Sequence, residues 1–270
     1  MLTIKNYVKA KSLAEAYELN QKRTNRILGG MLWMKMSNAS IQTAIDLSGL
    51  GLDTIEETED TFSIGCMVSL RQLEEHHALN TYTSGAIAES VKSIVGVQFR
   101  NLATVGGSIF GRFGFSDILT MFLALDTQVE LYHGGIIPLS EFVTMPRDND
   151  ILVRLIVKKV SLTSSYLSHR KSKTDFPVIA CAVSYFNGSY RAVIGARPQR
   201  AVLIEVPNEI LTADTKEKNA ELFADYVASQ VTTGSNMRAS AEYRLHLTKV
   251  LSKRGYLQVV QLQQTGGNMA

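Results

Sequence analysis

The chain has 270 residues, of which 45% are hydrophobic and 20% are charged, a composition typical of a soluble globular protein with two or three subdomains. Its net charge of +3 at pH 7 comes from scattered basic residues, which argues against nucleic acid or a membrane surface as a partner. Cys66 and Cys181 are too few and too far apart for a disulfide framework, a metal motif or an iron–sulfur cluster held by this chain alone.

The N-terminal residues lack the apolar core of a signal peptide. The longest apolar run, residues 118–125, is far too short to span a bilayer. We therefore expect no membrane insertion and a reducing, cytoplasmic location.

The first part of the chain, residues 1–58, is predicted to form a compact α/β unit, the first lobe of a larger domain. Ser12 and Glu15 have the spacing of a capping box and mark the start of a helix. Gly29 and Gly30 end the second expected strand. The expected strands are residues 2–8, 26–28 and 41–47, and the expected helices are residues 12–23 and 31–36.

A second part, residues 59–155, is predicted to form another lobe. It begins with an alternating strand and continues with helical patterns, and a glycine-containing segment that we expect to be a loop precedes its last apolar helix. A hairpin is expected to close around Gly134. The expected elements are a strand at 61–67, helices at 69–79, 85–94 and 117–125, and hairpin strands at 129–132 and 135–138.

The last part, residues 156–270, is predicted to be a small domain of strands followed by helices. The pair Asn187-Gly188 is a strong hairpin signal between two of the strands. The polar tail, residues 261–270, is expected to fray. The expected strands of this region are 152–160, 178–186 and 190–196, and the expected helices are 215–229 and 239–253.

The segment Thr104-Val105-Gly106-Gly107-Ser108 combines two adjacent glycines with two small hydroxyl residues. Successive N–H groups at glycines can converge on an anion, and no Cβ blocks the approach of a phosphate. The hydroxyls would add hydrogen-bond donors. An ordinary Gly-Gly turn explains the motif equally well, so the motif alone does not decide.

A second glycine pair offers the same chemistry earlier in the chain, with donors presented where a helix is expected to begin. Its alternative interpretation is a tight turn between strand and helix. Neither pair is a Rossmann fingerprint, because the chain contains no Gly-x-Gly-x-x-Gly. The second pair lies in the run Ile27-Leu28-Gly29-Gly30-Met31-Leu32.

Ser116 and Asp117 precede an apolar helix. Asp117 suits a hydrogen bond to a ribityl or ribose hydroxyl, and its alternative role is to cap the helix. No spacing of histidine, acidic or serine residues identifies a hydrolase or a metal site. We therefore assign no catalytic and no metal-binding residue.

Together these motifs resemble the FAD-binding subunit or domain of the xanthine dehydrogenase and carbon monoxide dehydrogenase family of molybdenum hydroxylases. The resemblance extends over nearly the whole chain. Its pieces, in chain order, are Ile27-Leu28-Gly29-Gly30, Gln98-Phe99-Arg100-Asn101, Thr104-Val105-Gly106-Gly107, Ser116-Asp117, Leu123-Ala124-Leu125-Asp126 and Met237-Arg238-Ala239-Ser240-Ala241-Glu242-Tyr243-Arg244.

The resemblance implies an α+β fold, in which a two-lobed FAD-binding domain (PCMH-type, vanillyl-alcohol-oxidase-like) precedes a small C-terminal domain of antiparallel sheet plus helices. FAD would lie extended between the lobes, with its pyrophosphate near the two glycine pairs. The cofactor-binding residues that the resemblance implies are Ile27, Leu28, Gly29, Gly30, Met31, Leu32, Thr104, Gly106, Gly107, Ser108, Ser116 and Asp117.

The resemblance also implies an electron-transfer role. FAD would take electrons from iron–sulfur clusters on a partner subunit and pass them to NAD or another acceptor, while a molybdopterin-binding subunit acts on the substrate. Departures from the family at Met31, Leu32 and Ser108 leave a second hypothesis, a scaffold subunit that kept the fold and lost the flavin. A third hypothesis is a stand-alone FAD-dependent reductase of the enolpyruvyl reductase type, for which we can assign no catalytic acid.

Overall fold

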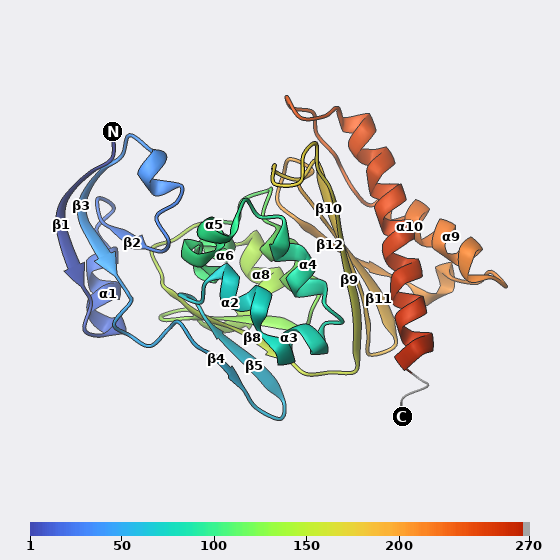
Figure 1. The fold of residues 1–270 in the computed structure, drawn as a ribbon, viewed down its shortest axis with the longest axis horizontal. Helices are drawn as coiled ribbons and strands as arrows, with labels where there is room; N and C mark the ends of the chain where they lie inside the picture. Colours follow the sequence, from blue (N-terminus) through green and yellow to red (C-terminus); the bar gives the residue numbers. More distant parts are fainter. Residues whose placement is uncertain (267–270) are drawn as a thin grey trace. The chain divides into compact units, whose positions relative to one another are not determined.

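The computed structural model describes residues 1–266 (Figure 1). The chain divides into two compact units. The division into three parts that the sequence predicts, 1–58, 59–155 and 156–270, stays a prediction. Unit 1 comprises Met1–Gln72, Val97–Gly111 and Thr127–Lys158, and unit 2 comprises Leu73–Gly96, Arg112–Asp126 and the chain from Lys159 onward.

A three-stranded parallel sheet forms the N-terminal part of unit 1, with strand order β1-β3-β2. Helix α1 (Leu13–Asn20) connects β1 to β2. Ser12 caps it by accepting a hydrogen bond from the N–H of Glu15 at 3.1 Å, which confirms the predicted helix start, while the Glu15 carboxylate accepts the N–H of Lys11 at 2.7 Å. The strands are β1 (Thr3–Lys9), β3 (Ser40–Asp46) and β2 (Arg26–Leu28).

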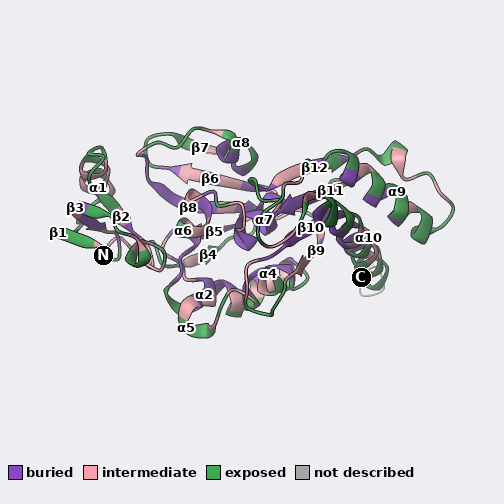
Figure 2. Cartoon of the chain, turned by 90° about the horizontal axis from the view of Figure 1, so that it is seen from above, coloured by how far each residue is buried: buried purple, intermediate pink, exposed green. Residues whose placement is uncertain are grey.

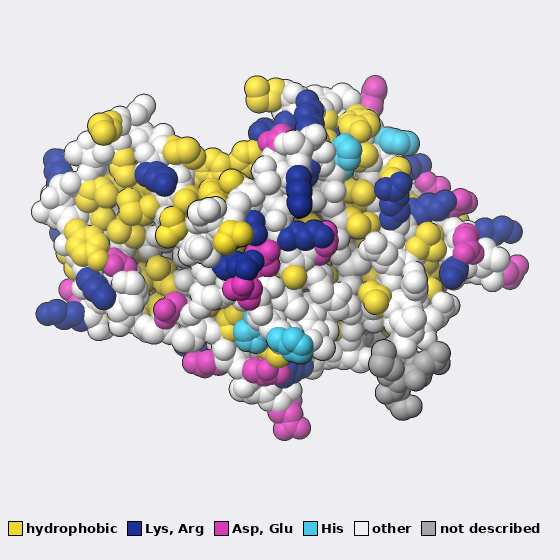
Figure 3. All heavy atoms as spheres, in the orientation of Figure 1, with side chains coloured by type: hydrophobic (Ala, Val, Ile, Leu, Met, Phe, Trp, Pro, Cys, Tyr) yellow, Lys and Arg dark blue, Asp and Glu magenta, His cyan; other side chains and the backbone are white. Residues whose placement is uncertain are grey.

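The prediction of a helix over residues 31–36 is wrong. Met31 has a φ of +59°, outside the helical region, so only a single 3₁₀ turn, η1 (Met34–Met36), forms. Trp33 and Met36 in this segment are exposed, as are Ile4 and Tyr7 in β1. Figure 3 shows hydrophobic side chains gathered over this sheet, although all-parallel sheets are normally covered on both faces.

The second sheet of unit 1 has five antiparallel strands in the order β4-β5-β8-β6-β7. The predicted hairpin is confirmed, because β6 pairs with β7 across Gly134. Helices α6 and α8 pack on this sheet. The strands are β4 (Ile55–Glu57), β5 (Thr61–Gly65), β8 (Leu152–Lys158), β6 (Thr127–Leu131) and β7 (Gly135–Pro138); the helices are α5 (Val97–Leu102), α6 (Val105–Phe110) and α8 (Leu139–Thr144).

The segment expected to be a glycine loop is the first turn of α6. Thr104 caps this helix, and its Oγ1 accepts a hydrogen bond from the N–H of Gly107 at 3.2 Å. Gly106 donates its N–H to the carbonyl of Cys66 at 2.8 Å. A Cβ at Gly106 would lie 2.8 Å from the same carbonyl oxygen, so only glycine allows the helix to start against this segment.

Unit 2 is built on a four-stranded antiparallel sheet with the order β12-β11-β10-β9. Helices α9 and α10 pack on one another, and α10 also packs on β9 and β10. The predicted C-terminal domain of antiparallel sheet plus helices, and the α+β class, are therefore confirmed. The strands are β9 (Leu162–His169), β10 (Ile179–Phe186), β11 (Ser189–Gly195) and β12 (Val202–Val206); the last helices are η2 (Asn208–Ile210), α9 (Lys216–Ser229) and α10 (Ala241–Gly266).

Helix α7 (Asp117–Leu123) lies in the interior of unit 2, where all seven of its residues are buried (Figure 2). It packs against α4 (Ala86–Lys92) and against β10 and β11. The helix predicted over residues 69–79 is interrupted, because the imidazole Nδ1 of His76 accepts the N–H of Leu79 at 3.2 Å and starts a new helix. The two resulting helices are α2 (Leu70–Glu75) and α3 (His77–Tyr82).

The last helix is longer than the sequence predicts, since α10 continues past residue 253 to Gly266. Gly255 does not end it. A Cβ at Gly255 would lie 2.7 Å from Val183 Cγ2, and the Gly255 carbonyl accepts a hydrogen bond from Ser165 Oγ at 3.1 Å. The glycine lets α10 lie close against β9 and β10. Residues 261–266 are thus helical rather than frayed, and residues 267–270 of the predicted tail lie outside the described residues.

Candidate functional site

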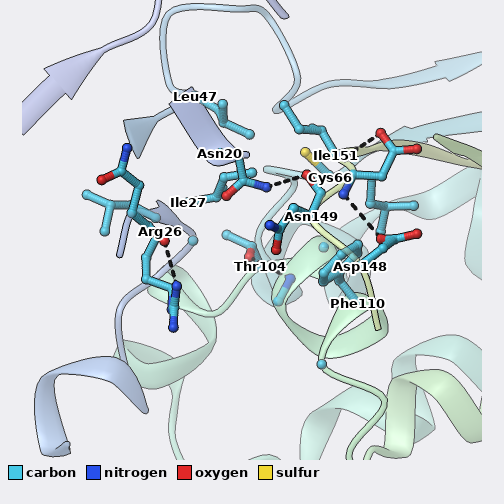
Figure 4. A pocket seen from close by; sticks show the side chains of 18 of the residues that line it. Asn20, Arg26, Ile27, Leu47, Cys66, Thr104, Phe110, Asp148, Asn149 and Ile151 are labelled. Carbon is cyan, nitrogen blue, oxygen red and sulfur yellow. Dashed lines mark hydrogen bonds between the residues drawn. The ribbon is translucent and has the colours of Figure 1, made fainter. Parts of the chain in front are cut away.

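Unit 1 contains a cavity of about 820 Å³, a volume within the range of small-molecule and cofactor sites. Its walls come from the end of α1 and the turn into β2, from the start of α6, and from the segment 147–152 that leads into β8 (Figure 4). Half of the twelve predicted cofactor-binding residues line it, namely Ile27, Leu28, Gly29, Thr104, Gly106 and Gly107.

The structure brings the two glycine pairs into direct contact. A Cβ at Gly30 would lie 1.8 Å from the carbonyl oxygen of Leu102, and a Cβ at Gly29 would lie 2.8 Å from Thr104 Oγ1. The two segments can approach this closely only because neither glycine has a side chain. A bare backbone surface therefore forms one wall of the cavity.

A hydrogen-bond donor remains available in this wall. The Thr104 hydroxyl accepts the N–H of Gly107 and keeps its own proton for a further acceptor. The N–H of Gly106, in contrast, is used by the Cys66 carbonyl. The donor that this part of the wall offers to an anion is thus the Thr104 hydroxyl.

Charged side chains in the cavity wall favour an anionic ligand. Arg23, Arg26 and Arg147 line it together with Asp148 and Asp150. The Asp150 carboxylate already accepts the backbone N–H groups of residues 133, 134 and 151, at 3.0, 2.8 and 2.7 Å. The charge of Asp150 is therefore partly satisfied by the protein. Arg26 and Arg147 likewise donate to the backbone carbonyls of Asn25 and Gly111, and the wall carries three guanidinium groups against two carboxylates.

Part of the remaining wall is apolar. Ile27, Leu47, Phe110 and Ile151 belong to it. Cys66 also lies there, and burial raises the pKa of its thiol to about 12, so this side chain is neutral at physiological pH. An apolar wall beside a backbone wall with donors is suited to a ligand that carries both a ring system and a phosphate.

Four predicted residues lie beside the cavity without lining it. Met31 packs on the small core cluster of the three-stranded sheet, and Ser108 donates its hydroxyl to the Thr104 carbonyl at 3.1 Å. Gly30 supports the wall through its contact with Leu102, as described above. The fourth residue that does not line the cavity is Leu32. The role of all four residues in cofactor binding stays a prediction.

Ser116 and Asp117 belong to unit 2. Ser116 caps α7, while the buried Asp117 carboxylate accepts hydrogen bonds from Arg170 Nη2 at 2.5 Å and from the hydroxyl of Tyr166. Burial raises the pKa of Asp117, and the Arg170 guanidinium opposes that shift. Both residues therefore have a structural role in unit 2, and their contact with a cofactor stays a prediction.

Several polar residues of the cavity wall were missed by the sequence interpretation. Asn20 and Gln21 fall inside the helix predicted over residues 12–23 and form the end of α1, and Arg147 and Asn149 lie in the polar loop before β8. A polar loop was recognisable in the sequence, but nothing in the pattern pairs residues this far apart.

Within residues 1–266, no group of three or more histidine, cysteine or acidic side chains is arranged to hold a metal ion. Among the same residues, no helix has both the length and the apolar character needed to cross a membrane.

Known proteins resemble this chain over most of its length. The xanthine dehydrogenase FAD-binding subunit of Escherichia coli is 26% identical over 282 residues, covering 94% of this chain and 95% of that protein. Quinoline 2-oxidoreductase from Pseudomonas putida has a chain of similar fold, with a TM-score of 0.84, 18% identity and 97% of both chains covered. Carbon monoxide dehydrogenase from Hydrogenophaga pseudoflava gives a TM-score of 0.84 at 20% identity, covering 95% of this chain and 97% of that one.

The family described as the FAD binding domain in molybdopterin dehydrogenase matches residues 2–163, which is more than half of the chain. This match agrees with the cavity in unit 1, whose lining residues all precede residue 163. The chain therefore belongs to the family of FAD-binding domains of molybdopterin dehydrogenases, and it is an FAD-dependent flavoprotein subunit of the oxidoreductase class.

Proposed function

We propose that this chain is the electron-transfer subunit of a molybdenum hydroxylase complex. It receives electrons from iron–sulfur clusters on one partner subunit and delivers them to NAD or another acceptor, while a molybdopterin-binding partner acts on the substrate. Bound FAD supplies the exchange between one-electron and two-electron chemistry. The observation that carries the proposal is the cavity in unit 1, which joins a bare glycine wall to an apolar wall.

The residues of the cavity fit a dinucleotide. Gly29 and Gly107 present backbone without side chains, and Thr104 offers a hydroxyl proton between them. Arg23 and Arg26 add positive charge at the same wall. We propose that this group binds the diphosphate, since backbone donors, a hydroxyl and guanidinium groups are the usual ligands of phosphate oxygens.

The apolar wall would exclude water from the ring system of the ligand. Phe110, Leu47 and Ile151 contribute no polar atom from their side chains. The neutral thiol of Cys66 adds no charge. In this proposal the chain binds, orients and shields the cofactor, and none of its side chains acts as an acid or a base.

The proposed partners follow from the cysteine content. The chain has two cysteines, and both are buried in separate places, Cys66 in unit 1 and Cys181 in unit 2. An iron–sulfur cluster takes four thiolates in most proteins. We therefore assign the clusters to a partner subunit and the molybdopterin to another.

The experiment is a titration of the purified chain with FAD, followed by flavin absorbance and by quenching of flavin fluorescence. Gly107→Leu fills the glycine wall and should abolish stoichiometric flavin while the variant still assembles with its partners. Asn101→Leu, at an exposed position of α5 that does not line the cavity, is the control and should retain flavin. If neither the isolated chain nor its complex binds stoichiometric flavin, the scaffold hypothesis replaces this one.

A further inference from the structure

The end of α1 is tied to the segment before β8 by three hydrogen bonds. Asn20 Nδ2 and Gln21 Nε2 both donate to the carbonyl oxygen of Asn149, at 2.7 and 3.2 Å. Asn149 Nδ2 donates in return to the Gln21 carbonyl at 3.4 Å. All three residues line the cavity, and Figure 4 shows the Asn20 amide directed at Asn149. The bonds therefore join two walls of the cavity that lie 128 or 129 positions apart in the chain.

An aromatic contact holds the same helix one turn earlier. The ring of Tyr17 is stacked on His133, with centroids 5.5 Å apart and planes 10° from parallel, and it also lies 5.2 Å from Tyr132. Asp150 links these two attachment points, because its carboxylate accepts the N–H groups of His133 and Gly134 and it directly follows Asn149. Helix α1 thus contacts two loops that Asp150 joins: Tyr17 packs on Tyr132 and His133, and the end of the helix bonds to Asn149.

The opposite side of the cavity is held differently. There Gly30 touches the backbone of Leu102, and Gly29 touches Thr104. Backbone packed against backbone cannot separate by a side-chain rotation. The Asn20–Gln21–Asn149 side, in contrast, depends on neutral hydrogen bonds in partly or fully exposed positions, which are the contacts that open first in local fluctuations.

We propose that Asn20, Gln21 and Asn149 form a clasp that sets how fast the dinucleotide enters and leaves the cavity. The glycine side acts as the fixed side, and the clasp opens and recloses around the ligand. Asn20 and Gln21 are positioning residues in this proposal. The identity of the ligand, FAD, rests on the proposed function.

The test replaces the two donors by side chains of similar size without charge, in the double variant Asn20→Leu/Gln21→Met. We expect FAD to dissociate about tenfold faster, because two net-stabilising hydrogen bonds are lost, and to associate no more slowly than with the wild-type chain. Stopped-flow flavin fluorescence measures both rates. Neutral replacements keep the charge of the cavity unchanged, so a change in rate cannot come from weaker attraction of the phosphates.

The control is Ser12→Ala, which removes the cap at the other end of α1. It should destabilise the same helix, as seen in a lower melting temperature, while the exchange rates of FAD stay at the wild-type values, because Ser12 does not line the cavity. A role of Asn20 and Gln21 in helix stability alone would make the double variant behave like this control.

Hydrogen exchange in the absence of FAD gives an independent measurement. The backbone amides of residues 147–152 should exchange faster in the double variant than in Ser12→Ala. The clasp is refuted if FAD exchanges at the wild-type rate from Asn20→Leu/Gln21→Met. A wild-type chain that takes up no FAD would instead overturn the proposed function, and the exchange of residues 147–152 would then decide whether the clasp exists.

Discussion

A methyl group at Gly30 should force the two glycine segments apart. Its Cβ would lie 1.8 Å from the carbonyl oxygen of Leu102 and 2.5 Å from the carbonyl carbon. A comfortable carbon–oxygen contact is about 3.3 Å, so the two backbones would have to separate by about 1.5 Å. No side-chain rotation relieves this clash, because the backbone fixes the position of a Cβ and the Leu102 atoms that it meets belong to the backbone.

The expected cost of Gly30→Ala is at the upper end of overpacking effects, about 3 kcal/mol or more. For a chain of this size that corresponds to a melting temperature lower by roughly 6–12 °C. Thermal unfolding followed by circular dichroism measures this loss. FAD titration of the folded variant should in addition show weaker binding, since the separated segments no longer form one wall.

The matched control is Gly107→Ala in the same wall. Its Cβ would lie 3.1 Å from Thr104 Oγ1, which a small side-chain movement can relieve, and alanine is the better helix former inside α6. We expect its stability to stay within about 1 kcal/mol of the wild type. Equal stability of Gly30→Ala and Gly107→Ala would refute the close contact between the two glycine segments.

Three further predictions concern buried polar groups. Arg170→Met leaves the Asp117 carboxylate buried without its charge partner and should cost about 3–5 kcal/mol in urea denaturation, most of which Asp117→Asn in the same chain should restore. Burial raises the pKa of the Cys66 and Cys181 thiols to about 12, so both should react with a thiol reagent at pH 8 only after unfolding. Because the thiols of the unfolded chain lose their protons first, near pH 9, the free energy of unfolding should fall as the pH rises above 9. A free energy of unfolding that stays constant between pH 8 and 10 would contradict the burial. Thr104→Ala removes the cap of α6 and should lower the free energy of unfolding by about 1 kcal/mol, whereas an unchanged value would show that the cap contributes nothing.

Local signals in the sequence predicted much of the fold. The hairpin at Asn187-Gly188 is confirmed, and both residues have the positive φ values, +51° and +78°, that a tight turn of this kind requires. The helix start at Ser12 is confirmed as well. These features depend on residues that are neighbours in the chain, which is why the sequence alone suffices to find them.

The failures occurred where tertiary contacts decide the conformation. The helix predicted over residues 239–253 was too short, because α10 continues through Gly255, whose missing side chain allows close contact between α10 and β10. Gly106 and Gly107 were interpreted as a loop, but they form the first turn of α6. Thr104 caps this turn, and the Cys66 carbonyl accepts the N–H of Gly106. In both cases a glycine was required by a neighbour remote in sequence rather than by its own backbone angles.

The same distinction applies to the cavity. Ile27, Leu28 and Gly29 could be predicted because a motif marks them, and the structure places them in the cavity wall. Asn20 and Asn149 could not, since amide side chains in polar segments carry no local signal and their pairing spans 129 positions. Resemblance to a family identifies motif residues, whereas the residues that hold the walls together become visible only in three dimensions.

The interleaving of the two units has a consequence for biosynthesis. The chain crosses between unit 1 and unit 2 five times, and β5 finds its partner β8 only once residues 152–158 have been made. A nascent chain of about half the full length therefore exposes the unpaired edges of β5 and β6, the two strands that pair with β8, and there aggregation and chaperone capture compete with folding. Neither unit can be excised as one continuous piece of gene, so this protein can be moved between larger enzymes only as a whole.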